Sequence, residues 1–182
     1  MRMFTKRDKA MKKSDFKIMV LLALFALLIA GCSSTPPSDQ VMEEKFRAHE
    51  ADFKKLASMF KEDANLDSVD ETAVYLPSAE PGNYPRAEIS SERLDEYRRL
   101  LKKTGVKKLF RRTDSIHFIV WRGWNGIDPG NSKAKDYVYA ETPRQPIADS
   151  LDQRDKLLID GSAPEVYKKI GDNWYLEYSE VG

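Results

Sequence analysis

An unbroken apolar run at residues 18–30 constrains this chain more than any other feature, because only Gly31 separates it from the single cysteine, Cys32. Residues 2–17 before the run hold seven Lys and Arg against two Asp. A basic head, an apolar run of this length and small residues at its end are typical of a secretory signal. As a helix the run would be about 20 Å long, whereas the hydrocarbon core of a bilayer is about 30 Å thick. The sequence therefore predicts a signal that is removed, not a retained membrane helix.

The residues around the cysteine refine this prediction. Ile29-Ala30-Gly31-Cys32 resembles the lipobox of bacterial lipoproteins, in which an aliphatic residue and two small residues precede the lipidated cysteine. The resemblance implies that a diacylglyceryl group is attached to the Cys32 sulfur, that the chain is cut after Gly31, and that the new amino group receives a fatty acid such as palmitate. Several acyl chains give stable membrane attachment, whereas a single chain binds only marginally. Both Met1 and Met11 fit as the start of such a signal.

This reading divides the chain into three parts. Residues 1–31 are expected to be the removed signal peptide, 32–40 a lipidated Ser/Pro tether, and 41–182 a single domain. The resemblance places the domain in the cell envelope, outside the cytoplasm and facing the periplasm. Position 33, directly after the cysteine, holds Ser and not Asp. In a host that has two membranes, this resembles the pattern of lipoproteins sent to the outer membrane.

The charge of the expected mature protein is mildly acidic. The whole chain has a net charge of +1, but residues 1–31 hold seven of its 30 Lys and Arg and two of its 29 Asp and Glu, which leaves −4 for the remainder. This balance gives no electrostatic support to a nucleic-acid partner. Acylation of Cys32 would leave no free thiol, so the domain has to be stable without disulfides.

Two helices are predicted from apolar periodicity. The first begins at Ser38 or Asp39 and runs to about residue 63, and the second covers residues 92–104 with Ser91 as its cap and Gly105 as its stop. The first helix carries an apolar stripe at steps of three and four residues, formed by Met42, Phe46, His49, Phe53, Leu56 and Phe60.

Short β-branched and aromatic runs predict the strands. They lie at residues 72–76, 106–112, 115–121, 136–141 and 157–159, followed by a hairpin of 166–170 with 174–178. The expected fold class is α+β, with two helices packed on an antiparallel sheet of about five or six strands. Residues 167–176 resemble the close of small envelope lipoproteins of unassigned function.

A search for catalytic motifs finds neither a phosphate-binding loop nor a nucleophile elbow, and the only histidines, His49 and His117, do not form a metal-binding pair. We therefore predict no enzymatic activity, no cofactor and no metal. Asp149, Asp152 and Asp155 are spaced as a weak cation site, but a solvated acidic turn is the favoured interpretation.

Two groups of residues are candidates for binding. Lys107, Lys108, Arg111 and Arg112 close a stretch of basic residues that contains no acid, and they could face anionic headgroups or simply solvent. Trp121, Trp124, Tyr137 and Tyr139 flank an irregular loop and suit glycan stacking or a protein hot spot, with core packing as the alternative.

The preferred function is a lipid-anchored, non-enzymatic binding module of the bacterial envelope. Its partners would be membrane lipid through acylated Cys32, and an envelope protein or glycan. Two alternatives stay open, an inhibitor or immunity-type lipoprotein directed against a toxin or lytic enzyme, and a self-associating structural protein of the envelope.

Overall fold

A computed structural model of the chain describes residues 35–78, 85–124, 132–152 and 165–181. The predicted signal peptide, Cys32, the strand at 157–159, Asp155 and the middle of the irregular loop lie outside these residues. The chain divides into two units, Met1–Ser34 and Thr35–Gly182, and the described residues belong to the second unit. No helix in this described part of the chain is long and apolar enough to cross a membrane.

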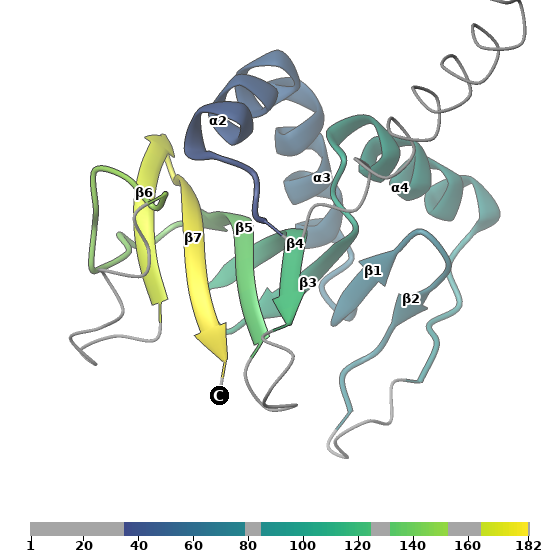
Figure 1. Cartoon of the computed structure of the whole chain (residues 1–182). Helices are drawn as coiled ribbons and strands as arrows, with labels where there is room; N and C mark the ends of the chain where they lie inside the picture. The colour runs from purple at the N-terminus through teal and green to yellow at the C-terminus, as the bar shows by residue number, and fades with distance from the viewer. Residues whose placement is uncertain (1–34, 79–84, 125–131, 153–164, 182) are drawn as a thin grey trace, which may run out of the picture. The chain divides into compact units, whose positions relative to one another are not determined.

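A seven-stranded antiparallel sheet is the main element of the domain (Figure 1). Its strand order is β2-β1-β3-β4-β5-β7-β6. The strands are β1 (Ser68–Asp70), β2 (Val74–Tyr75), β3 (Lys108–Arg112), β4 (Ser115–Trp124), β5 (Ser132–Ala140), β6 (Glu165–Gly171) and β7 (Trp174–Val181). The α+β class is confirmed, but the predicted number of five or six strands is too low. The sequence analysis missed β1, which has only three residues and therefore no readable alternation.

Three helices accompany the sheet, α2 (Asp39–Ala48), α3 (Glu50–Glu62) and α4 (Ser91–Thr104). The single long helix expected after Ser38 is divided because the backbone leaves helical geometry at His49, where φ is −127° and ψ is 22°. The cap of α4 is Ser90, not Ser91, since the Ser90 hydroxyl accepts the N–H of Arg93. The predicted stop at Gly105 is confirmed by its left-handed φ of 70°.

Aromatic rings join α2 and α3 to one face of the sheet. The ring of Phe53 in α3 lies 4.6 Å from that of Tyr137 in β5 and 5.9 Å from that of Phe118 in β4, between centroids. Phe46 of α2 contacts Trp174 of β7 at 5.1 Å. Because side chains alternate along a strand, the residues between these aromatic positions point to the opposite face of the sheet.

Both edges of the sheet are covered by short segments outside the regular strands. Along β6, the N–H of Ala148 donates to Tyr167 O at 2.8 Å, and the N–H of Tyr167 donates to Pro146 O at 3.0 Å. Along β2, the N–H of Ala87 donates to Val74 O at 2.9 Å. Some backbone N–H and C=O groups on the outer sides of β6 and β2 therefore form hydrogen bonds within the molecule.

A buried lysine fixes the start of the domain to the middle of the sheet. Lys135 of β5 is 0% exposed, and its Nζ lies 2.7 Å from Asp39 Oδ1, 2.7 Å from Asp152 Oδ1 and 2.9 Å from the carbonyl oxygen of Pro37. Asp39 Oδ2 also accepts the N–H of Leu151 at 2.8 Å. Burial raises the pKa of Asp39, but the hydrogen bonds from Lys135 and Leu151 outweigh it, so the pKa lies below its usual value of 3.8.

We expect Lys135→Met to lower the free energy of unfolding by about 3 kcal/mol, because it leaves a buried carboxylate without its principal partner. Urea unfolding followed by circular dichroism measures this loss. Lys169→Met, at an exposed position of β6, is the matched control and should change the unfolding free energy by less than about 0.5 kcal/mol. Equal losses in the two variants would show that Lys135 has no special role.

The lowered pKa of Asp39 predicts a loss of stability in acid. Ionised Asp39 stabilises the folded state above its unfolded pKa of 3.8, and this contribution disappears as the pH falls through the lower folded value. Asp39→Asn should therefore be less stable than the unmodified protein at pH 6, and the difference should shrink as the pH approaches 2. Unfolding curves across this range test it. A difference that is independent of pH would contradict the assignment.

Candidate functional site

The four basic residues predicted as one patch are divided between the two faces of the sheet. Alternation along β3 places Lys108 and Arg112 on one face and Arg111 on the other. Arg111 donates to the carbonyl oxygens of Leu66 and Phe60, and its guanidinium lies 4.6 Å from the Phe60 ring centroid. Arg111 therefore helps to hold the end of α3 and the segment that follows it against β3.

Most of the remaining charges of this stretch are also engaged, whereas Lys102 and Lys107 are exposed. Arg112 pairs with Glu165, and Lys108 lies 5.3 Å from the centroid of the Tyr75 ring. On α4, basic side chains pair with acidic ones, as Arg98–Asp95, Arg99–Glu96 and Lys103–Asp52. Binding of the patch to an anionic surface stays a prediction, and it would have to compete with these ion pairs.

The four predicted aromatic residues do not form one surface either. Tyr137 is 1% exposed and donates its hydroxyl to the carbonyl oxygen of Met42 at 2.8 Å, so it is a core residue. Trp121 is half-buried against the core, and the side chain of Trp124 lies outside the described part. Tyr139 is half-buried, and Lys61 Nζ lies 3.0 Å from its hydroxyl and 4.3 Å from its ring centroid.

Two open hollows nevertheless meet at Tyr139 and Lys61, and both residues line each hollow. We call the two hollows together the Tyr139 groove. The first hollow has a volume of about 340 Å³ and lies where α3 meets the sheet. The second has a volume of about 290 Å³ and lies beside the turn between β3 and β4. Beyond the shared pair, polar lining residues of the groove include Lys54, Ser58, Asp114, Glu141, Asp172 and Asn173.

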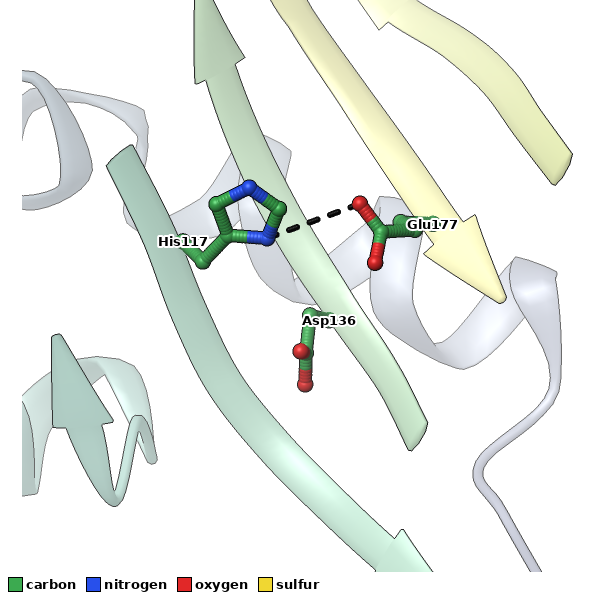
Figure 2. Close-up of side chains that lie close together, drawn as sticks. All are labelled: His117, Asp136 and Glu177. Atoms are coloured by element: carbon green, nitrogen blue, oxygen red, sulfur yellow. Dashed lines mark ion pairs between the residues drawn. The ribbon is translucent and has the colours of Figure 1, made fainter. Parts of the chain in front are cut away.

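A second candidate site is a cluster of three ionisable residues on the opposite face of the sheet, His117 of β4, Asp136 of β5 and Glu177 of β7. Each is 1% exposed. The register places Asp136 directly opposite Glu177, and His117 opposite Val138, two residues further along β5 and therefore on the same face. Figure 2 shows the three side chains on these adjacent strands, with the imidazole ring and the Glu177 carboxylate facing each other and Asp136 beside them.

The histidine is oriented from both sides of its ring. Its Nδ1 lies 3.5 Å from Glu177 Oε2, and its Nε2 lies 3.0 Å from Ser115 Oγ. Phe110 stacks on the ring at 4.6 Å between centroids. Within the described residues, neither His117 Nδ1 nor either carboxylate oxygen of Glu177 has a hydrogen-bond partner of good geometry. Asp136 Oδ2, in contrast, lies 2.8 Å from Nη1 of Arg122.

Burial sets the protonation of this cluster. It raises the pKa of Glu177 to about 7, assisted by the negative charge of Glu165 and opposed by the positive charge of Arg112. It raises the pKa of Asp136 to about 6 against the attraction of Arg122, and it lowers the pKa of His117 to about 3. The imidazole is therefore neutral at physiological pH, and the two carboxyl groups bind protons more readily than exposed ones do.

The order Ser115, His117, Glu177 places a hydroxyl, an imidazole and a carboxylate as in a nucleophilic relay. A general base works best with a pKa near the operating pH, and burial lowers that of His117 far below this range. A neutral imidazole next to two carboxylates is instead a common ligand set for a divalent metal ion. The arrangement suits coordination better than acyl transfer.

The sequence analysis missed this cluster because its members are far apart in the chain and match no spaced motif. Each is a polar residue within a strand that is otherwise rich in apolar residues, and that was the only available signal. Whether three such residues meet depends on the register of three strands, which no local pattern reveals.

No family model matches the chain, and neither a curated protein nor a solved structure does so.

Proposed function

We propose that the chain is a lipid-anchored lipoprotein of the bacterial envelope, and that its domain is a non-enzymatic binding module held outside the cytoplasm. In a host with two membranes the proposed location is the outer membrane. The lipobox-like residues that end at Cys32 support the anchor. The aromatic core between the helices and the sheet supports a domain that folds without disulfides.

The observation that carries this proposal is the fixed start of the domain. Lys135 holds the carbonyl oxygen of Pro37, which follows Cys32 by only five positions. Five extended residues span at most about 18 Å. An acylated Cys32 would therefore keep the domain next to the bilayer, because the tether is too short to let it move away.

The Tyr139 groove is the surface that we propose for ligand binding, and the proposed ligand is a hydroxyl-rich glycan of the envelope. The groove is open, and charged and polar side chains of its lining, such as Lys54 and Asp172, lie beside the aromatic ring of Tyr139, a combination that suits hydrogen bonding to hydroxyl groups and stacking on a sugar ring. Among the described residues, the exposed large hydrophobic side chains are Val41 and Ile147, and neither lines the groove. Protein interfaces depend on apolar anchors that become buried, so this surface fits a glycan better than a protein partner.

Replacing the cysteine tests the anchor. We expect the unmodified protein to fractionate with membranes and to carry the mass of a cleaved, acylated chain, because several acyl chains bind a bilayer stably. The Cys32→Ala variant should lack the added mass of the acyl groups and should no longer fractionate with membranes. The Ser33→Ala variant should keep both the added mass and the membrane association. An unmodified sulfur on the native protein, found by mass spectrometry, would contradict the proposal.

Paired variants on α3 test the groove. Lys54 lines the groove, whereas its neighbour Lys55 points away and pairs with Glu96. We expect Lys54→Ala and Asp172→Ala to weaken binding to purified envelope glycan by about tenfold, and Lys55→Ala to leave it unchanged, since a lost charge-assisted hydrogen bond costs about 1.5 kcal/mol. Co-sedimentation with the glycan measures this. Absence of glycan binding, or equal binding by all variants, would overturn the groove as a glycan site.

A further inference from the structure

We propose that His117, Asp136 and Glu177 bind one divalent transition-metal ion of the zinc type, on the face of the sheet opposite the aromatic core. This inference goes beyond the proposed function, because neither the lipid anchor nor the Tyr139 groove requires a metal. It uses three strands that are neighbours in the centre of the sheet, β4, β5 and β7.

The distances between the ligand atoms fit a small cation. One nitrogen or oxygen atom from each of the three residues lies within 4.8 Å of the other two. Zinc binds nitrogen and oxygen at about 2.0–2.2 Å, so two ligand atoms of a tetrahedral site are about 3.3–3.5 Å apart. The 3.5 Å between His117 Nδ1 and Glu177 Oε2 already meets this spacing. A small shift of Asp136 completes a three-ligand site with one further open position.

Polar atoms of the cluster face one another without a hydrogen-bond partner among the described residues. His117 Nδ1 and both oxygens of Glu177 are buried and lack a hydrogen-bond partner within the described residues. A buried polar atom that is left without a hydrogen-bond partner destabilises the folded protein. When Nε2–H donates to Ser115 Oγ, Nδ1 presents its lone pair to the Glu177 carboxylate. Two electron-rich groups then face each other, and a cation between them removes the repulsion.

The residues around the proposed ligands fix their orientation, as the residues around the ligands of a metal site do. Ser115 contacts the ring nitrogen of His117 that faces away from the cluster, and Phe110 stacks on the ring. A partner on the second nitrogen of a ligating histidine fixes its tautomer and its direction. Arg122 pairs with Asp136 through a side chain that is 38% exposed, so it can turn to solvent when a cation takes its place.

The ligand types favour a transition metal over calcium or magnesium. Calcium takes six to eight oxygen ligands, and magnesium keeps several waters in an octahedral shell. The cluster offers one imidazole and two carboxylates, and imidazole suits zinc, iron and related ions. Two ionised carboxylates and a neutral imidazole would also balance the charge of a divalent ion.

The experiment uses the full chain, purified in detergent and stripped with a chelator. Zn²⁺ is titrated by calorimetry, Co²⁺ by visible absorption, and the histidine ring nitrogens are followed by NMR after ¹⁵N-histidine labelling. We expect one ion per chain, a rise in the melting temperature, and a shift of a single imidazole. Glu177→Gln and Asp136→Asn keep the side-chain shape and should weaken binding at least about tenfold.

The second histidine supplies the control. His49 lies on the surface beside Asp52, so His49→Ala should bind Zn²⁺ as the unmodified chain does, and its NMR spectrum assigns the remaining signal to His117. Natively folded protein that binds neither Zn²⁺ nor Co²⁺ would overturn the proposal, as would binding that His49→Ala abolishes. The NMR result on the unmodified chain decides the matter even if both carboxylate variants fail to fold. Membrane attachment through Cys32 is tested separately, so either idea can fail alone.

Discussion

The alternation of side chains along β4, β5 and β7 is the constraint on which the rest of this domain depends. One residue of each strand is buried in the core, namely Phe118, Tyr137 and Leu176. The residue next to each of them in the chain therefore faces the opposite side of the sheet, namely His117, Asp136 and Glu177. A shift of one residue in any of these strands would move an ionisable group among aromatic rings, at a cost of several kcal/mol. The core thereby fixes the register, and the register brings the polar cluster together.

Strand β5 shows how much one short segment contributes. Three consecutive residues have three separate tasks, because Lys135 binds the start of the domain, Asp136 joins the polar cluster and Tyr137 packs against Phe53. The central position of β5, between β4 and β7, makes this possible. A change in the backbone of this strand would disturb the tether, the cluster and the core at once.

The elements that were predicted from the sequence are those that leave a periodic or turn-forming pattern within a short segment. The apolar stripe from Met42 to Phe60 and the left-handed Gly105 identified the helices, and the alternation around residues 171–173 identified the last hairpin. The division at His49 and the three-residue strand β1 leave no such mark in the sequence. The basic patch was read as contiguous charge, but Arg111 binds the carbonyl oxygens of Leu66 and Phe60. Proximity along the chain does not tell which face of a strand a charge occupies.

The coverage of the sheet edges would have a consequence if the domain is held on a membrane as proposed. Molecules confined to two dimensions meet far more often than the same number in solution, and an open strand invites a neighbouring copy to extend the sheet. The segment at Pro146–Ala148 occupies backbone groups of β6, and Ala87 does the same beside β2. In the proposed membrane-anchored protein, these covered edges would oppose the pairing of strands between neighbouring copies and so leave the Tyr139 groove accessible.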